Sequence, residues 1–188
     1  MQEAVPEGKG SMLAILGLEK EKILEEIKTI ASQGVCEIAN DNCPGQIVVS
    51  GEKNVVEKIS DSFKKKSIKC IALPVSAPFH CSLMKNAEEN MKSKITDAVF
   101  EQPNPGIISN VTAKMENDPA TIKELLVKQI TSTVRWRESL EYMMNNGIDQ
   151  FIEIGPGKVL SGLVKRTNRK IKISNLNSLE DVSNYKSK

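Results

Sequence analysis

The sequence predicts an α/β protein in two parts, and two patterns support this prediction. Within residues 10–73, four short apolar runs of strand length alternate with two segments of helical periodicity, in the order βαββαβ. This order is typical of a ferredoxin-like unit, in which two helices pack on one face of a four-stranded antiparallel sheet. Within residues 74–188, helices alternate with single strands, as expected of a layer built on a parallel sheet.

Turn-forming residues separate the elements of the first part. Gly17 ends the first strand, and Gly34 stops the first helix. Asn, Pro and Gly within residues 41–45 favour a turn between the second and third strands. The expected strands are 12–16, 36–40, 46–50 and 69–73, and the expected helices carry Ile23 to Ala31 and Val55 to Phe63.

The second part carries helical patterns with few strands between them. Ser82 is a suitable cap for the first helix, and either Asp118 or Thr121 opens the next. About three strands are few for a sheet buried on both faces. The expected strands are 106–111, 150–154 and 171–173, and the expected helices lie within 82–98, 118–130, 136–145, 159–164 and 179–185.

Composition excludes several classes of protein. The chain has 188 residues, a net charge of +2 and 4% aromatic residues, so a nucleic-acid binder is not expected. No apolar run approaches the roughly 20 residues of a membrane span, and no signal peptide is recognisable. The four cysteines form no C-x-x-C pair, and one histidine is too few for a Cys/His zinc set, so we expect reduced thiols and no metal. These features predict a cytoplasmic protein.

His80 is the only histidine, and it stands in an extended segment between Pro74 and a predicted helix. Because imidazole titrates near neutrality, His80 is the first candidate for proton transfer, although a structural histidine is the alternative. Cys81 could pair with it as a nucleophile. Neighbouring side chains in an extended segment point to opposite sides, which disfavours that pairing.

Several motifs in this order and spacing resemble one family, the malonyl-CoA:acyl carrier protein transacylases of bacterial fatty-acid synthesis. Among them are Pro78-Phe79-His80-Cys81 and Ile154-Gly155-Pro156-Gly157. The matching stretches are residues 1–8, 42–51, 73–84, 109–111, 126–129, 134–136 and 154–160. The resemblance implies an α/β-hydrolase-like core with parallel sheet and an inserted ferredoxin-like subdomain. Residues 1–9 would then be the end of an upstream core helix and a linker, and 74–188 the C-terminal part of the core.

The resemblance also implies a reaction and its residues. Malonyl passes from malonyl-CoA, a substrate, to acyl carrier protein through a serine ester, without a cofactor. His80 would be the general base, and Gln129 would offer the carbonyl oxygen that orients its ring. Asn110, at a strand end, would line the substrate site, although a purely structural role is the alternative. We expect malonyl-CoA and acyl carrier protein as partners, neither nucleic acid nor membrane, and a monomer.

The chain departs from this family at two residues. No G-x-S-x-G nucleophile motif occurs in the sequence, and the arginine that pairs with the malonyl carboxylate has no match. Arg135 is a poor substitute, since Trp136 and the following helix favour packing. The alternative function is a non-catalytic module that docks acyl carrier protein through the Lys64-Lys65-Lys66 run. The Gly155-Pro156-Gly157 segment is expected to be a turn rather than a phosphate cradle.

Overall fold

The computed structural model describes residues 4–186, with the side chain of Lys186 left out. Contacts divide the chain into two compact units, Met1–Ser139 and Leu140–Lys188, which are described separately. The helix end expected near the start falls in part on residues 1–3, outside the described residues. The linker after it closes as a turn, in which Lys9 N donates to Pro6 O over 3.1 Å. No helix among the described residues is long and apolar enough to cross a membrane.

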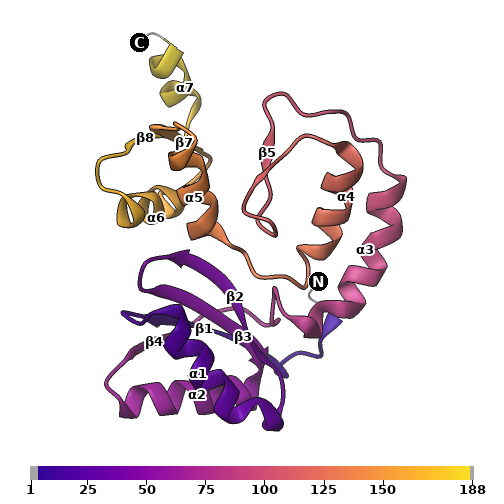
Figure 1. The fold of residues 1–188 in the computed structure, drawn as a ribbon, viewed down its shortest axis with the longest axis vertical. Helices are drawn as coiled ribbons and strands as arrows, with labels where there is room; N and C mark the ends of the chain where they lie inside the picture. The colour runs from indigo at the N-terminus through magenta and orange to yellow at the C-terminus, as the bar shows by residue number, and fades with distance from the viewer. Residues whose placement is uncertain (1–3, 187–188) are drawn as a thin grey trace. The chain divides into compact units, whose positions relative to one another are not determined.

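The first unit contains the predicted ferredoxin-like sheet (Figure 1). Its four strands are antiparallel neighbours in the order β2-β3-β1-β4, with helices after the first and third strands. Its elements are β1 (Gly10–Leu16), α1 (Lys20–Ile30), η2 (Ala31–Gln33), β2 (Cys36–Cys43), β3 (Gln46–Glu52), α2 (Lys53–Lys65) and β4 (Lys69–Ala72). Gly34 has a φ of 140°, which explains why the first helical segment ends there.

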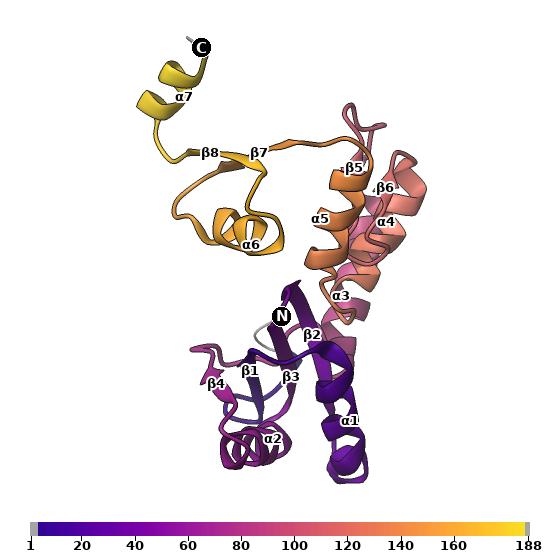
Figure 2. The ribbon, with the colours of Figure 1, turned by 60° about the vertical axis from the view of Figure 1, so that its left-hand side comes forward.

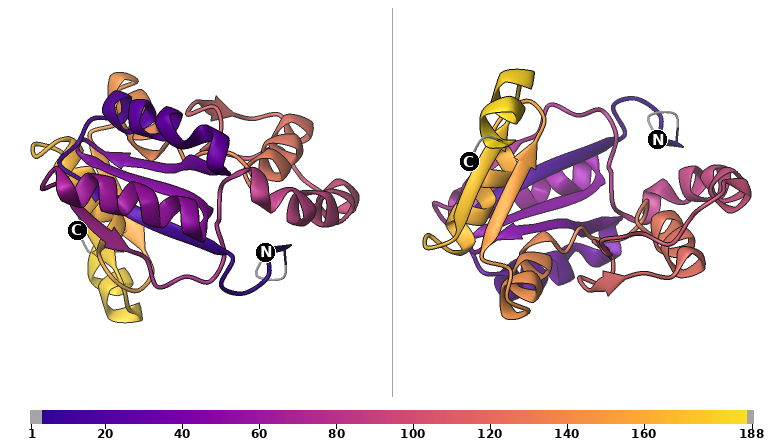
Figure 3. Two further views of the ribbon diagram at one scale, coloured as in Figure 1. Left: turned by 90° about the horizontal axis from the view of Figure 1, so that it is seen from below. Right: turned by 90° about the horizontal axis from the view of Figure 1, so that it is seen from above.

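The two faces of this sheet are buried by different partners. Both helices lie on the same face, as the left view of Figure 3 shows, and Ile23, Ile59 and Phe63 are among the side chains that fill the core between them. On the opposite face, Met12 and Val48 belong to a second apolar cluster that Leu73 and Phe79 cover. The residue before His80 is therefore seated on the sheet, on the face away from the helices.

The second strand extends three residues beyond its predicted end, to Cys43. The expected turn at 41–45 shrinks accordingly to Pro44 and Gly45. Register shifts between Ile38 and Asn40 and between Asp41 and Cys43 mark irregular pairing with β3. Such bulges add a residue to one strand without ending it. The prediction was wrong here because Asp41 reads as a turn former, whereas its carboxylate forms ion pairs inside the protein.

A helical pair and a small hairpin complete the first unit. Helices α3 and α4 pack side by side (Figures 1 and 2). Of the strand predicted at 106–111, only two residues pair, and their partner is an antiparallel strand that the sequence did not predict. These elements are η3 (Ser82–Met84), α3 (Lys85–Asp97), β5 (Ile107–Ile108), β6 (Met115–Glu116), α4 (Pro119–Lys128) and the start of α5 (Trp136–Asn145).

The second unit contains the parallel pairing that the helix–strand alternation predicts. Strand β7 (Gln150–Ile154) pairs in parallel with β8 (Lys172–Leu176), and α6 (Val159–Thr167) connects them (Figure 2). Helix α6 buries Leu163 and Val164. Helix α7 (Leu179–Lys186) follows β8. The domain boundaries at 73 and 74 remain a prediction.

Candidate functional site

The segment around His80 is anchored on both sides of the histidine. Before it, the buried Pro78 ring lies against β1 so closely that a Cβ on Gly10 would stand 2.2 Å from Pro78 Cδ. After it, the buried Cys81 thiol donates to Pro78 O over 3.1 Å. Ser82 is not the helix cap that the sequence suggested, because its backbone N–H and its hydroxyl both donate to the Glu37 carboxylate on β2. His80 thus stands between fixed neighbours.

The backbone of His80 itself has a positive φ of 60°. A left-handed conformation costs an L-residue other than glycine about 1–2 kcal/mol, so the surroundings must enforce it. The anchors at Pro78, Cys81 and Ser82 provide that constraint. Strained residues of this kind concentrate at functional sites, which favours a functional role for His80.

The structure brings the two predicted catalytic residues together. His80 Nδ1 lies 3.0 Å from the backbone carbonyl oxygen of Gln129. A carbonyl only accepts, so Nδ1 carries the proton in this contact and Nε2 keeps its lone pair. The Gln129 side-chain Nε2 donates to Ser132 O over 3.4 Å and also lies 3.5 Å from His80 Nδ1. Because the contact with the main-chain carbonyl is shorter by 0.5 Å, we assign the orientation of the ring to the main chain of Gln129.

The position of Gln129 at the end of α4 explains why its carbonyl is available. Gln129 is the C-cap of this helix, and its own N–H still bonds to Leu125 O. The last carbonyls of a helix have no partner within the helix, and the helix dipole makes that end partly negative. His80 satisfies one of these carbonyls.

A clamp that the sequence did not reveal holds the residues after Gln129 against β2. Thr133 Oγ1 donates to Ile38 O, and Val134 exchanges backbone hydrogen bonds with Ala39 O and Asp41 N at 2.8 and 2.9 Å. Arg137 then donates from Nε and Nη2 to the two carboxylate oxygens of Asp41 at 2.9 and 2.8 Å. These contacts, which we call the β2 clamp, fix the chain four residues beyond the carbonyl that orients His80.

Asn110 shares a small pocket with Gln129, and within residues 4–186 it makes no hydrogen bond to His80. This pocket, of about 170 Å³, lies between the β5–β6 hairpin and α4. Its lining includes the apolar side chains of Ile108, Ile122 and Leu125. The backbone of Asn110 accepts from Arg135 N, whereas its side-chain amide makes no hydrogen bond within residues 4–186. The amide is thus free for a ligand, and its substrate role remains a prediction.

The charged side chains considered as alternatives are engaged elsewhere. Arg135 donates to Val111 O, to Thr112 O and to the Glu138 carboxylate, and this ion pair raises the pKa of Arg135. Arg135 therefore bonds to nearby backbone of the same chain, in keeping with the packing role that its sequence context suggested. In the lysine run, Lys66 pairs with Glu26 at 2.5 Å and Lys64 with Asp61 at 3.7 Å. This pairing reduces the charge available for an acidic partner.

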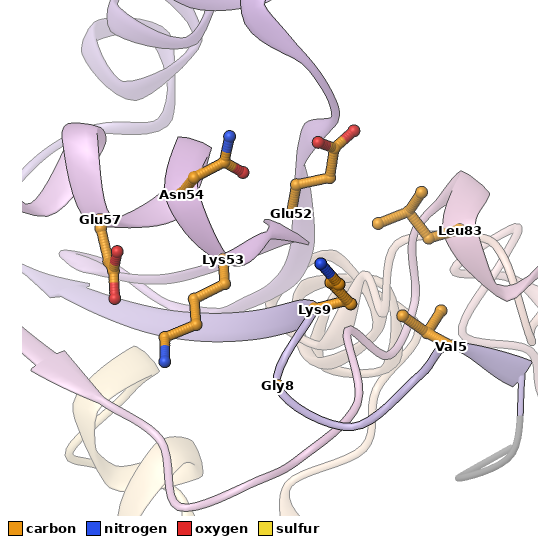
Figure 4. Close-up of a pocket in the computed structure, with 8 residues that line it drawn as sticks. All are labelled: Val5, Gly8, Lys9, Glu52, Lys53, Asn54, Glu57 and Leu83. Carbon is orange, nitrogen blue, oxygen red and sulfur yellow. The ribbon is translucent and has the colours of Figure 1, made fainter.

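A second pocket, of about 590 Å³, lies beside the His80 segment (Figure 4). Figure 4 shows Val5 and Leu83 at one side of it and Lys53 and Glu57 of α2 at the other. Lysines and glutamates both line this pocket, so its charge favours neither an anion nor a cation. No group of three or more His, Cys, Asp or Glu within the described part of the chain is arranged to hold a metal.

Comparison with known proteins identifies the family. The family model "Acyl transferase domain" matches residues 1–187. This chain belongs to the acyl transferase domain family. The malonyl CoA-acyl carrier protein transacylase of Staphylococcus aureus strain MRSA252 is 44% identical over 187 residues, which cover 98% of this chain and 61% of that protein. The malonyl CoA-acyl carrier protein transacylase of Bacillus subtilis strain 168 is 45% identical over 174 residues, which cover 92% of this chain and 55% of that protein.

Solved structures have the same fold as this acyl transferase domain. The acyl-carrier-protein S-malonyltransferase of Bartonella henselae superposes with a TM-score of 0.94 at 42% identity, covering 98% of this chain and 59% of that one. A malonyl-transacylase solved in complex with its type II PKS acyl-carrier protein superposes with a TM-score of 0.92 at 38% identity. The match covers 97% of this chain and 59% of that one. The predicted α/β fold class is confirmed. The chain spans about 60% of the relatives that it matches.

Burial disfavours Cys81 as the nucleophile of this acyl transferase domain. Its thiol is fully buried, and burial raises its pKa. The neighbouring Cys36 has its pKa raised to about 12, also mainly by burial. Since the thiolate is the reactive form, neither cysteine is activated for attack.

In this acyl transferase domain, the Gly155-Pro156-Gly157 segment follows the end of β7 and leads into α6. The Glu153 carboxylate accepts from the backbone of Leu160 and Ser161 at 3.0 and 2.8 Å, and from the Ser161 hydroxyl. These amides belong to the N-terminus of α6, where a bound phosphate would otherwise sit. An internal carboxylate already occupies them, which favours the turn interpretation over a phosphate cradle.

Acid is expected to loosen this turn. The Ser161 hydroxyl, followed by the Ser161 and Leu160 amides, holds the pKa of Glu153 below its ordinary value of 4.5. The stabilisation is therefore complete above pH 4.5 and lost as the pH falls through the folded-state pKa. Amide hydrogen exchange of Leu160 and Ser161, corrected for intrinsic rates, should accelerate in that range. In Glu153→Ala, which has no side-chain acceptor, the two amides should exchange fast at every pH; protection that remains in this variant contradicts the assignment.

Proposed function

We propose that this chain provides the general base for the transfer of malonyl from malonyl-CoA to acyl carrier protein. The relatives that carry the names of this reaction cover nearly the whole chain. The observation that carries the proposal is the 3.0 Å contact of His80 Nδ1 with the Gln129 carbonyl. With Nδ1–H donating there, Nε2 is the atom that can accept a proton from a serine hydroxyl.

The proposed reaction has two half-reactions. Nε2 of His80 takes the serine proton while the serine oxygen attacks the malonyl thioester, and the imidazolium then returns the proton to the departing coenzyme A sulfur. In the second half-reaction, Nε2 takes the proton of the carrier thiol, whose sulfur attacks the serine ester. The serine leaves with that proton. No cofactor takes part, and Asn110 is proposed to bind substrate through its free amide.

The serine is proposed to come from residues outside this sequence, because no Gly-x-Ser-x-Gly motif occurs in it. The carboxylate-binding arginine is proposed to come from the same source. A main-chain carbonyl is a weaker partner for imidazolium than a carboxylate. We further propose a monomer that acts in the cytoplasm.

Incubation with malonyl-CoA is expected to leave the isolated chain unmodified. Intact-mass and peptide mass spectrometry should detect no malonyl ester on any of its serines, because none stands in a nucleophile motif. When the chain is fused to the unmatched part of the Staphylococcus aureus relative, the ester should form on the serine of that added part. A malonylated serine within residues 1–188 of the isolated chain contradicts the proposal.

A further inference from the structure

The turn after α4 determines where the Gln129 carbonyl points. A peptide group is planar, so the direction of this carbonyl depends on the placement of the next residue, Ile130. The N–H groups of Ile130 and Thr131 still bond back to α4, each over 3.2 Å, which continues the helical turn past Gln129. The contact of the carbonyl with His80 therefore depends on what holds Ile130 and Thr131.

Helix α3 holds both of these residues. Ile130 is 8% exposed and belongs to one apolar cluster with Ala87 of α3. The Thr131 hydroxyl donates to the carboxylate of Glu88, the next residue of α3. Between Gln129 and the β2 clamp, no other side chain of the described residues forms a hydrogen bond to another element. Glu88 is therefore the polar anchor of this short segment.

Glu88 is itself fixed and charged. Its carboxylate uses separate oxygens, Oε1 for the Lys85 ammonium and Oε2 for the Thr131 hydroxyl. The Glu88 side chain is only 14% exposed, whereas that of Lys85 is 60% exposed. Lys85 and then Thr131 hold the pKa of Glu88 below its ordinary value of 4.5, so the carboxylate is ionised at neutral pH. A hydrogen bond to an ionised acceptor is stronger than one between neutral groups.

The same helix also continues from the His80 segment. Residues 81–84 connect His80 to the start of α3, and Met84 is fully buried in the apolar cluster that includes Ile130. Figures 1 and 2 show α3 beside α4, at whose end Gln129 lies. Helix α3 is thus attached to both partners of the hydrogen bond, to His80 through the chain and to Gln129 through the residues that follow it.

We propose that Glu88 is a positioning residue for His80. By holding Thr131 it fixes the peptide group after Gln129, so that the carbonyl stays directed at Nδ1 and keeps the proton there. Glu88 makes no hydrogen bond to His80 within residues 4–186, so it acts through Thr131 rather than on the ring. The inference deepens the proposed function and rests on it for the role of His80 as the general base.

The test detects the tautomer of His80 in the full chain. A ¹⁵N long-range correlation spectrum, recorded where the ring is neutral, should show the proton on Nδ1 alone in the unmodified chain. Glu88→Ala and Thr131→Val should each lose this single form and show exchange between the two tautomers. Thr131→Ser keeps a hydroxyl for Glu88 and should keep the single form. The double variant Glu88→Ala/Thr131→Val should match the more affected single variant, since both changes break one contact.

Glu89→Ala is the matched control. Glu89 is exposed on the same helix and carries the same charge, so its removal should leave the tautomer of His80 unchanged. Activity is measured with the chain fused to the unmatched part of the Staphylococcus aureus relative. There, Glu88→Ala should lower kcat about tenfold, within the roughly 10²-fold that misplacement of a catalytic group can cost, with the KM for malonyl-CoA within about twofold. Glu89→Ala should change neither constant.

A single Nδ1–H form in both Glu88→Ala and Thr131→Val would overturn the inference, even if both variants melt at lower temperature, because the contact would then be structural only. Loss of that form in Thr131→Ser or in Glu89→Ala would overturn it as well. If Glu88→Ala does not fold, the comparison of Thr131→Val with Thr131→Ser decides alone. A changed tautomer in Glu88→Ala together with full activity of His80→Gln would contradict the proposed function while supporting the role of Glu88 in orienting the ring.

Discussion

Replacing His80 with glutamine is expected to lower the rate of malonyl transfer by about 10²–10⁴-fold, the usual contribution of a general base. Glutamine keeps a polar side chain at the anchored segment but cannot take a proton from a serine hydroxyl. The assay uses the chain fused to the unmatched part of the Staphylococcus aureus relative. It follows the release of coenzyme A thiol with acyl carrier protein as acceptor.

Gln129→Ala is the matched control for this experiment. The structure assigns the orienting role to the main-chain carbonyl of Gln129, which alanine retains, so kcat should change by no more than a few fold. The size of this change in kcat distinguishes the main-chain carbonyl of Gln129 from its side-chain amide as the group that orients His80. A loss in Gln129→Ala as large as that in His80→Gln would show that the amide is the working group. A His80→Gln variant with unchanged activity would contradict the assignment of His80 as the general base.

Replacing Asp41 with alanine is expected to cost about 3 kcal/mol of unfolding free energy, toward the lower end of values for breaking a buried ion pair. The Asp41 side chain is fully buried and receives two hydrogen bonds from Arg137, with Lys20 at 3.6 Å. Alanine leaves those cations facing a methyl group. Arg137 remains 29% exposed, which allows water to reach it and limits the cost. Urea unfolding followed by fluorescence of Trp136, the only tryptophan and the neighbour of Arg137, measures the loss.

Asp61→Ala is the control for a carboxylate that is paired at the surface. Asp61 lies 3.7 Å from Lys64, both side chains are more than half exposed, and such pairs contribute at most about 1 kcal/mol. The difference between the two variants should therefore exceed about 2 kcal/mol. If Asp41→Ala and Asp61→Ala prove equally stable, the β2 clamp does not hold the structure as described.

Local patterns were sufficient to predict the ferredoxin-like sheet. Apolar residues recur at helical spacing around Ile23 and again around Ile59, and strand-length apolar runs lie between these two segments. Each segment buries its apolar side chains against its immediate neighbours. Asp118 likewise caps α4 through Thr121, a contact that spans three residues. In such cases the determining interactions lie within the segment itself.

Contacts distant in sequence account for the differences. Asp41 lies in a strand rather than a turn, and its carboxylate is held there by Arg137, which is 96 residues away in the sequence. Ser82 bonds to Glu37, 45 residues earlier, instead of capping its helix. At the site, sequence motifs indicated His80 and Gln129 through family resemblance. The use of a main-chain carbonyl depends on where α4 ends against the His80 segment, which no local pattern contains.

The tautomer of His80 tests the account most directly. As the only histidine in the chain, it gives a single imidazole spin system, so a ¹⁵N long-range correlation spectrum needs no assignment. At a pH where the ring is neutral, the contact with the Gln129 carbonyl predicts a protonated Nδ1 and an unprotonated Nε2. A spectrum with the proton on Nε2, or with fast exchange between the two forms, would contradict it, because Nε2 could then not serve as the base.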